Sequence, residues 1–430
     1  MGLYNEASLI MYPSGVKASK IYCQKPTDGS GDLTFSRAST ATRVNESGLI
    51  EAVASNVPRI DYTGGGCGKL LLEPQRTNLY LNSEDFSNAV YTLNNTLVST
   101  NTAASPDGNT TADTLYQNTA NSQHAIYQSA SFTSGTDYVF SWFVKSNGTT
   151  QWVQIAFSTG FDITDYCNFD ILNGVNGNNT GIVHGIESYD NGWYRVWAKN
   201  TALSTITNIG AALALLQGDT AARIPTYTGD GVSGVNVWGA QMEAGTYPTS
   251  YIPTAGSTVT RVQDDYSLSN VYTNNLITAS GGTWFIHILN NTERVRNSVG
   301  GIYLAETNAY NSSNGLRIGQ TSTTKTRLKV VRYLGGATTT YTTTADVIKL
   351  ALSWNGATWD LWENGIKVVS AESFTFTALE YLASSLDLSY EIQKQVLFPT
   401  ALSDAELEYL TGTSYNSYEL MAVDLGYTVL

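Results

Sequence analysis

The sequence predicts an all-β protein with two β-sandwich domains, an N-terminal arm and one short helix near the C-terminus. Short runs of β-branched and aromatic residues recur along the chain and end at clusters of Gly, Asn, Ser and Thr, as strands joined by turns do. Charged residues make up only 14% of the 430 residues, so Ser, Thr, Asn and the 38 glycines must supply most of the polar surface. Many short strands at this spacing indicate sandwiches or barrels.

The charge balance and the distribution of apolar residues each exclude one class of partner. The chain has 23 Lys and Arg against 36 Asp and Glu, a net charge of −13, and shows no basic stripe. Nucleic acid is therefore not expected as a partner, because its binding requires cations that displace counterions. No run approaches the roughly 18 consecutive apolar residues that cross a membrane, so no membrane insertion is expected.

The N-terminus and the cysteines carry no processing or metal signal. The chain begins Met-Gly-Leu-Tyr-Asn-Glu and lacks the basic and apolar stretches of a secretion signal. The cysteines, at 23, 67 and 167, are odd in number and widely spaced. Neither a zinc site nor a disulfide framework is indicated.

Residues 1–75 are predicted to form an N-terminal arm. Turn clusters at 26–31, 45–48 and 64–66 separate short apolar pieces such as Ser8–Tyr12. A segment of this kind becomes ordered only against something else. It is either a docking arm for a partner or an extension that adds strands to a following domain, and both alternatives stay open here.

Residues 76–262 are expected to form the first sandwich. Tyr138–Lys145 is rich in β-branched and aromatic residues, and Gln151–Phe157 follows a short Ser-Asn-Gly turn as its hairpin partner. Further strands are expected at Trp193–Ala198 and Val235–Ala240. No segment here repeats apolar residues with the period of a helix, so no helix is expected.

Residues 263–430 are expected to form the second sandwich, after a stretch punctuated by Pro and Gly. Its clearest hairpin pairs Val347–Trp354 with Trp359–Glu363. The connecting Asn355-Gly356 favours a hairpin because both residue types tolerate positive φ. A second Asn-Gly pair, at 364–365, is expected to turn the chain again.

One short helix is predicted near the C-terminus. Ser403 can cap it, Glu406 three residues later completes a capping box, and Gly412 ends it. Leu407 and Leu410 are expected on its inner face.

No catalytic residue is predicted. One group of β-sandwich glycoside hydrolases carries its carboxylates as Glu-x-Asp-x-x-Glu on one strand, and this pattern does not occur in the sequence. Asp360 and Glu363 fall on opposite faces of a strand, so they do not make the facing carboxylate pair that glycan cleavage requires. A pair assembled from distant strands stays open. The protein is therefore expected not to be an enzyme.

No metal site or cofactor is predicted, although a structural calcium ion stays open as an alternative. Asp162, Asp165 and Asp170 lie close together in the sequence, and oxygen ligands of this kind hold calcium in many binding modules. Solvated loop carboxylates are the favoured interpretation.

Three aromatic residues, Trp152, Tyr194 and Trp362, are the candidate glycan-binding residues. Trp152 shares a strand face with Gln154 and Ala156, the more polar face of that strand, and Trp362 alternates against Leu361. Exposed rings on such faces could stack against the apolar faces of sugars. Core packing is the more common fate of any single Trp, and it is the expectation for the Trp residues at 142, 238 and 354.

Several separate blocks of sequence occur in an order that resembles one group of proteins. The blocks are Phe35–Val44, Gly48–Glu51, Leu70–Leu79, Asn82–Ser87, Trp193–Arg195, Trp238–Gly245 and Pro248–Thr254. They resemble tailed-phage virion proteins, including head-fibre and tail-fibre proteins of the crAss-like phage group. The resemblance covers roughly residues 30–262 and implies a carbohydrate-binding-module-like jelly roll for residues 76–262.

Residues 263–430 resemble concanavalin-A-like or laminin-G-like domains. The matching features are the hairpin around Asn355-Gly356, Leu361–Gly365 and Leu402–Glu406. The resemblance bears on the fold, since such domains host glycan binding, protein binding and purely structural roles alike.

Together these features predict a non-enzymatic structural protein of a phage virion, a head-fibre or tail-fibre subunit made in the host cytoplasm and displayed on the particle surface. Residues 1–75 would dock it to capsid or tail proteins, and the sandwiches would adhere to host or mucosal glycans. A homo-oligomer, dimer or trimer, is expected because sheet edges and apolar patches need partners. The alternatives are a capsule-depolymerising tail spike enzyme and a capsid-decoration protein without a ligand.

Overall fold

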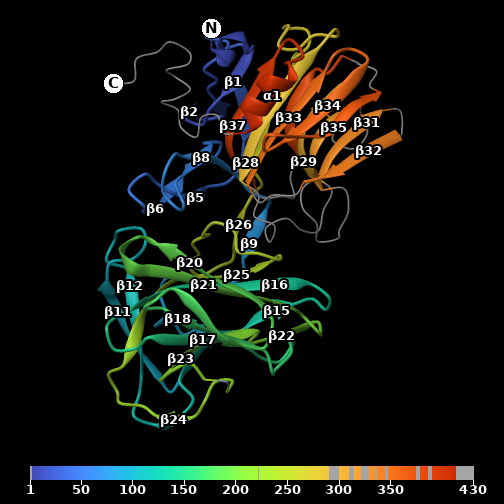
Figure 1. Ribbon diagram of the computed structural model, residues 1–430. Helices are drawn as coiled ribbons and strands as arrows, with labels where there is room; N and C mark the ends of the chain where they lie inside the picture. The colour runs from blue at the N-terminus through green and yellow to red at the C-terminus, as the bar shows by residue number, and fades with distance from the viewer. Residues whose placement is uncertain are drawn as a thin grey trace. The chain divides into compact units, whose positions relative to one another are not determined.

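The computed structural model divides the chain into two compact units (Figure 1). It describes residues 2–220, 222–289, 300–308, 314–320, 329–334, 337–343, 347–373, 378–385 and 390–412. Unit 1 comprises Met1–Thr40, Val53–Gln75 and Val262–Leu430, and unit 2 comprises Ala41–Ala52 and Arg76–Arg261. The described residues are mostly in antiparallel strands, which confirms the all-β prediction.

Unit 1 is a sandwich of two large sheets. One sheet has nine strands in the order β2-β3-β4-β27-β36-β29-β30-β31-β32, and the other has the order β35-β34-β33-β28-β37-β8-β7, with β1 also paired to β37. The strands are β1 (Leu9–Met11), β2 (Val16–Lys17), β3 (Lys20–Ile21), β4 (Leu33–Ser36), β7 (Arg59–Asp61), β8 (Lys69–Leu72), β27 (Asp265–Leu268), β28 (Gly282–Leu289), β29 (Gly300–Ala305), β30 (Gly315–Gln320), β31 (Lys329–Leu334), β32 (Ala337–Thr342), β33 (Val347–Trp354), β34 (Thr358–Glu363), β35 (Ile366–Ser373), β36 (Tyr381–Ser385) and β37 (Tyr390–Phe398).

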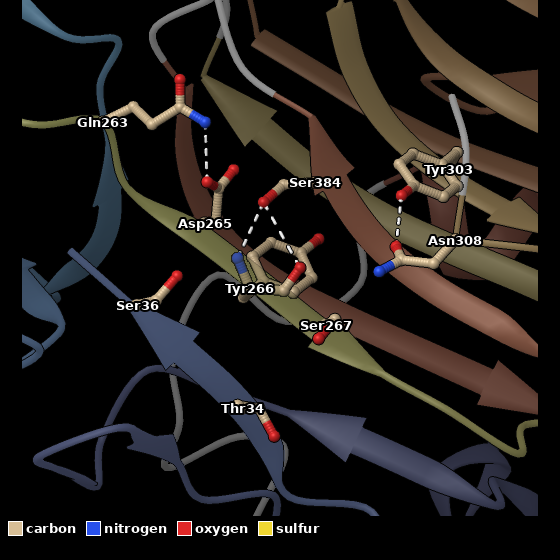
Figure 2. A pocket seen from close by; sticks show the side chains of 9 residues that line it. All are labelled: Thr34, Ser36, Gln263, Asp265, Tyr266, Ser267, Tyr303, Asn308 and Ser384. Atoms are coloured by element: carbon tan, nitrogen blue, oxygen red, sulfur yellow. Dashed lines mark hydrogen bonds between the residues drawn. The ribbon is translucent and has the colours of Figure 1, made fainter. Parts of the chain in front are cut away.

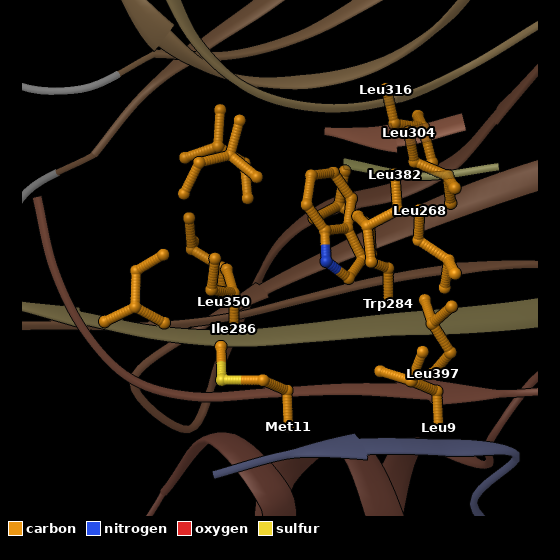
Figure 3. Close-up of a cluster of buried hydrophobic side chains, with 14 of the residues drawn as sticks. Leu9, Met11, Leu268, Trp284, Ile286, Leu304, Leu316, Leu350, Leu382 and Leu397 are labelled. Atoms are coloured by element: carbon orange, nitrogen blue, oxygen red, sulfur yellow. The ribbon is translucent and has the colours of Figure 1, made fainter. Parts of the chain in front are cut away.

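The core of unit 1 lies between these two sheets. Alternate residues of β28, among them Trp284 and Ile286, are fully buried in one cluster with Leu304 and Leu382 of the facing sheet. Figure 3 shows the Trp284 ring directed towards these leucines. Alternation places every second side chain on this inner face, so each strand supplies a few apolar contacts to one continuous core.

The prediction that residues 1–75 form a separate arm is wrong. Leu9 of β1 pairs with Leu397 of β37, Leu70 of β8 pairs with Ile392 of the same strand, and β4 pairs with β27. The apolar pieces of this segment are too short to bury their own faces, so most of them complete the sheets of unit 1, while Ala41–Ala52 belongs to unit 2. The strand-adding alternative is the one observed. At the other boundary, the division between Arg261 and Val262 lies one residue from the predicted domain end.

The predicted hairpin around Asn355-Gly356 and the predicted helix are confirmed. β33 pairs with β34 with Trp354 opposite Trp359, and Gly356 has a φ of 88° in the turn between them. Helix α1 (Asp404–Thr411) begins after Ser403 and ends at Gly412. It buries Leu407 and Leu410 in a cluster on the outer face of the β28 sheet. The other members of this cluster include Phe285 and Tyr4, and Tyr4 lies in the short 3-10 helix η1 (Leu3–Glu6).

Replacing Ser403 with Ala is expected to lower the stability of the α1 turn by about 1 kcal/mol. The Glu406 carboxylate accepts hydrogen bonds from the Ser403 backbone N–H at 2.7 Å and from its hydroxyl at 2.6 Å, so the substitution removes one partner of the capping box. Faster amide hydrogen exchange in residues 404–411 would show the loss. Replacement of the exposed Ser131 by Ala serves as the control, and equal exchange in both variants would contradict the prediction.

Unit 2 is a second sandwich, with two sheets of six strands in the orders β10-β14-β23-β17-β18-β19 and β11-β12-β25-β16-β21-β20. Pairs β13-β24, β15-β22, β26-β9 and β5-β6 are small additional sheets, and η2 (Asp190–Gly192) is a short 3-10 helix. The strands are β5 (Ala41–Val44), β6 (Ile50–Val53), β9 (Arg76–Asn78), β10 (Tyr91–Asn94), β11 (Thr96–Ala103), β12 (Ala112–Gln117), β13 (Asn121–Ser122), β14 (Ala125–Gln128), β15 (Ala130–Phe132), β16 (Asp137–Ser146), β17 (Trp152–Phe157), β18 (Tyr166–Asp170), β19 (Val175–Asn179), β20 (Val183–Tyr189), β21 (Trp193–Thr201), β22 (Ile206–Asn208), β23 (Ala211–Leu216), β24 (Tyr227–Thr228), β25 (Gly234–Ala244) and β26 (Val259–Arg261).

The core of unit 2 is rich in aromatic residues, as its strand composition predicts. Trp142, Phe140 and Val153 lie in the cluster between the two sheets. The predicted hairpin of Tyr138–Lys145 with Gln151–Phe157 is wrong, because β16 and β17 lie in different sheets and each pairs with strands from elsewhere in the chain. On the outer face of the second sheet, the β5–β6 hairpin adds Val44 and Ile50 to a cluster with Trp238 and others. The hairpin formed by the turn-rich segment around residue 47 therefore closes a face of unit 2 that would otherwise expose large apolar rings.

Candidate functional site

Trp362 is not an exposed platform, and the prediction that placed it on an accessible strand face is wrong. Its side chain is 6% exposed and lies in the outer apolar cluster of unit 1 with Leu407 and Phe285. Lys367 Nζ lies 5.8 Å from the ring centroid. The alternation of β34 does point Trp362 away from the main core, but helix α1 and the N-terminal segment cover that face.

Trp152 and Tyr194 are both half-buried in unit 2, and they do not form one platform. Trp152 projects from the face of β17 opposite the core residue Val153, while Tyr194 packs against the core cluster itself. A methyl group at Gly177 would lie 2.6 Å from the Trp152 ring, and one at Gly174 would lie 2.5 Å from the Tyr194 ring. The backbone of the β18–β19 hairpin therefore packs closely against both rings.

The polar strand face around Trp152 is closed by the chain's own loop after β23. Gln154 and Asn168, both fully buried, hydrogen-bond to each other at 2.8 Å. Asn168 Nδ2 also donates to Asp219 Oδ1 at 2.8 Å, and the Ile224 backbone N–H donates to Gln154 Oε1 at 2.6 Å. These buried amides are satisfied within the fold, so the polarity of this face has a structural explanation.

The blocks that carry the phage-protein resemblance build buried polar networks. In unit 1, Arg37 Nη1 contacts Asp264 Oδ1 at 2.9 Å, and Arg59 contacts Asp264 and also Glu73, the latter at 2.7 Å. All four side chains are almost fully buried. Burial alone would lower the pKa of Arg59, but the carboxylates of Asp264 and Glu73 raise that pKa above its ordinary value. Two arginines and two carboxylates thus neutralise one another inside the fold.

A second network lies in unit 2, in the blocks around residues 241 and 249. Glu243 accepts hydrogen bonds from the backbone N–H of Thr249 at 2.7 Å and from its hydroxyl at 2.6 Å. Arg195 Nη1 donates to the Thr249 carbonyl at 2.6 Å, and Gln241 Oε1 accepts from the Ile252 backbone N–H at 2.7 Å. The side chains of this network hold loops against strands. Because they are buried, they are not accessible to a ligand.

An open polar pocket lies on the outer face of the nine-stranded sheet in unit 1. Its volume is about 370 Å³. The lining residues come from β4, β27, β29, β36 and the adjoining loops, and Figure 2 shows them: Thr34, Ser36, Gln263, Asp265, Tyr266, Ser267, Tyr303, Asn308 and Ser384. Strand register brings them together, since Thr34 pairs with Ser267, and both Ser267 and Tyr303 pair with Ala383. The register therefore brings Thr34, Ser267 and Tyr303 into one row across the sheet, and these residues line the pocket.

Part of the pocket's polar surface is fixed by internal hydrogen bonds. Gln263 Nε2 donates to Asp265 Oδ2 at 2.7 Å, and the Tyr303 hydroxyl donates to Asn308 Oδ1 at 2.6 Å (Figure 2). Within the described part of the chain, no hydrogen bond is found for Asp265 Oδ1 or for the hydroxyls of Thr34, Ser36 and Ser267. The pocket thus combines oriented amides with hydrogen-bonding groups that remain open to a ligand.

Burial shifts the acid–base properties of this pocket. Desolvation raises the pKa of Asp265; the hydrogen bond from Gln263 opposes this shift, and the nearby charge of Asp264 adds to it. Burial also raises the pKa of the Tyr303 hydroxyl, the charge of Asp265 raises it further, and Arg317 lowers it. A carboxylate whose charge is incompletely stabilised favours a ligand that donates hydrogen bonds to it.

The pocket lacks the paired carboxylates of a glycosidase. Of its described lining residues, Asp265 is the one carboxylate. The other pair considered from the sequence is also occupied, because Asp360 contacts Lys367 at 3.3 Å and buried Glu363 accepts from the Tyr341 hydroxyl at 2.8 Å. The arrangement can hold a polar ligand, and no acid-and-nucleophile pair is assembled among these residues.

The three carboxylates considered for calcium bind protein donors. Asp162 accepts from Thr164 at 2.7 Å, Asp165 accepts from Asn200 at 2.8 Å, and Asp170 accepts from Asn173 at 2.7 Å. Within the described ranges, no group of three or more His, Cys, Asp or Glu side chains could hold a metal ion. Turn and strand-end hydrogen bonds account for these acids.

One signal for the pocket is present in the sequence and was missed. Leu33–Ser36 and Asp265–Leu268 both alternate apolar with polar residues, which predicts a polar outer face on each strand. The pairing of these two strands, which are far apart along the chain, could not be read from the pattern. Tyr303 and Asn308 carried no separate signal.

Solved structures that resemble the chain include a toxin binding domain and laminin domains. No model of a known family matches the chain, and no curated protein matches it. The chain is similar to the binding domain of botulinum neurotoxin DC, solved with rat synaptotagmin II, at 13% identity and a TM-score of 0.27; the match covers 35% of this chain and 40% of that chain. It is also similar to domains LG4-5 of the mouse laminin α1 chain, at 12% identity and a TM-score of 0.19, over 62% of this chain and 85% of that chain. Scores this low carry no argument about function.

Across the described residues, no helix has the length and apolar character needed to span a membrane.

Proposed function

We propose that this protein is a non-enzymatic surface component of a tailed-phage virion, a head-fibre or tail-fibre subunit, which adheres to carbohydrate through the polar pocket of unit 1. The single observation that carries the adhesion part is the pocket itself. It offers a carboxylate oxygen and three hydroxyls, from Thr34, Ser36 and Ser267, that are open to a ligand beside amides already held in place. Its volume of about 370 Å³ falls in the range of small-molecule sites.

The virion part of the proposal is supported by the sequence blocks described above and by the low fraction of charged residues. Because Met1–Thr40 belongs to unit 1, attachment to capsid or tail proteins would use a folded surface of that unit rather than a free arm. A dimer or trimer would serve adhesion well, since several weak sugar sites on one particle act together.

Filling the pocket is expected to weaken carbohydrate binding without unfolding the protein. Ser267→Phe places a ring on the pocket floor, at a half-buried position on the outer sheet face, and should weaken binding on a glycan array at least about tenfold. Ser131→Phe makes the same change on an exposed strand of unit 2 and should leave binding unchanged. Equal binding by both variants would show that the pocket is not the site.

The location on the particle is tested by labelling purified virions with gold-tagged antibody against residues 263–430. Label over the capsid would support a head-fibre role, and label at the tail tip would support host recognition. Intact particles without label would contradict the virion-surface proposal. Wild-type protein that binds no glycan, combined with labelled capsids that lose stability without it, would instead favour a decoration protein.

A further inference from the structure

We infer that the pocket of unit 1 selects an uncharged, hydroxyl-rich sugar residue, held by hydroxyl donation to Asp265, and rejects acidic sugars. This inference rests on the proposed carbohydrate binding and names the class of sugar. The observations behind it are the free carboxylate oxygen of Asp265, the row of hydroxyls beside it, and the absence of a cationic side chain among the described lining residues.

The geometry of the carboxylate sets the direction of the hydrogen bonds. Asp265 Oδ2 already accepts from Gln263 at 2.7 Å, which leaves Oδ1 as an acceptor on the pocket side. An ionised carboxylate only accepts hydrogen bonds, so the ligand must present a donor such as a sugar hydroxyl. The Asn308 amide nitrogen and the hydroxyls of Thr34 and Ser267 can then bond neighbouring sugar oxygens.

The charges around the pocket disfavour an anionic ligand. The next carboxylate, Asp264, is neutralised by Arg37 and Arg59 beneath the sheet surface, so neither arginine is available to meet a ligand carboxylate. Arg317 lies beside Tyr303 but is buried and does not line the pocket. A uronic acid would therefore bring its negative charge close to Asp265 without a compensating cation from the lining residues.

Binding should also depend on the ionisation of Asp265. The groups that act on this carboxyl are Asp264, the Gln263 amide and the Tyr303 hydroxyl, and burial raises its pKa above the ordinary value. A hydrogen bond donated by a sugar hydroxyl favours the ionised form of Asp265. The affinity for the sugar should therefore fall as the pH drops through the raised pKa of Asp265. The loss should begin at a higher pH than for an exposed aspartate.

The test compares sugars that differ at C6, where the hydroxymethyl group of the neutral sugar is a carboxylate in the uronate. Oligosaccharides of galactose and mannose are titrated into the full chain in parallel with matched oligogalacturonate and oligomannuronate. The wild type is expected to bind a neutral member at least about tenfold more tightly than its uronate, since one hydrogen bond to a charged group accounts for such a ratio. Asp265→Asn should lose most of this preference and the acid sensitivity, and Asp162→Asn should lose neither.

Two failures are distinguishable. If the uronates bind as tightly as the neutral sugars, or if Asp265→Asn binds normally while Ser267→Phe does not, the pocket binds carbohydrate but the inference about Asp265 is overturned. If the wild type binds none of these sugars and no other glycan, the proposed adhesion itself fails, and the inference fails with it.

Discussion

Replacing Asp264 with Asn is expected to lower the free energy of unfolding of unit 1 by about 3–5 kcal/mol. Asp264 is fully buried and contacts two buried arginines, Arg37 at 2.9 Å and Arg59. Its Oδ2 also accepts the backbone N–H of Glu73 at 2.9 Å, which ties the segment after β8 to the segment before β27. The amide keeps the size of the side chain but leaves one buried guanidinium charge without compensation.

The neighbouring residue provides a matched control. Asp265→Asn makes the same chemical change one position away, in the open pocket, whose described lining residues include no arginine. It is expected to change stability by less than about 1 kcal/mol, because its charge is partly solvated. Urea unfolding of the full chain measures both variants, and hydrogen exchange in β27 and β28 assigns the transition to unit 1. Similar stability losses in the two variants would contradict the structural role of the buried network.

Asp264 and Asp265 also illustrate why the pocket residues were harder to recognise in the sequence than the residues of the buried network. Arg37 and Glu73 lie in two of the sequence blocks singled out above, and the structure buries both in the Asp264 network. The pocket residues are serines and threonines on strand faces, which look like ordinary solvated positions.

The secondary structure was readable where local chemistry decides it. Asn355-Gly356, Asn364-Gly365 and the Ser403 capping box act within a few residues, and each forms as predicted. The assignment of residues 1–75 failed because it depends on pairing across the chain, such as Leu9 with Leu397. The prediction that Trp362 is exposed was wrong for the same reason, since the helix that covers this side chain, α1, comes from a later part of the chain.

The stability of unit 1 is expected to depend on pH through His287. This side chain is 4% exposed on β28 and pairs in register with Lys349 of β33 and Lys394 of β37. Burial, followed by the charges of Lys349 and Lys394, lowers the pKa of His287 from 6.5 to about 3. On the far side, Lys394 donates to the hydroxyl of Tyr4 at 2.6 Å.

The sign of the effect follows from proton linkage. The unfolded chain binds a proton at residue 287 below about pH 6.5, whereas the folded chain does so only near pH 3. Stability is therefore lost as the pH falls from about 6.5 to about 3, at roughly 1.4 kcal/mol per pH unit. His287→Leu removes this contribution, so the variant should gain about 2–3 kcal/mol relative to wild type between pH 7.5 and pH 4.5.

The Lys394→Met variant serves as a comparison that distinguishes the contribution of His287 from a general loss of stability in acid. Burial, with a smaller contribution from Lys349, lowers the pKa of Lys394 from 10.5 to about 7. Between about pH 7 and pH 10.5 the unfolded chain therefore binds one more proton at residue 394 than the folded chain, so this lysine makes stability rise with pH in that range, above the range in which His287 acts. Urea unfolding at pH 4.5, 7.5 and 9.5 should show the His287→Leu variant with a flatter acid limb and the Lys394→Met variant with a flatter alkaline limb. An unchanged acid limb in His287→Leu would mean that His287 is charged in the folded protein, and that the cationic row of β33, β28 and β37 is compensated by a group that faces it.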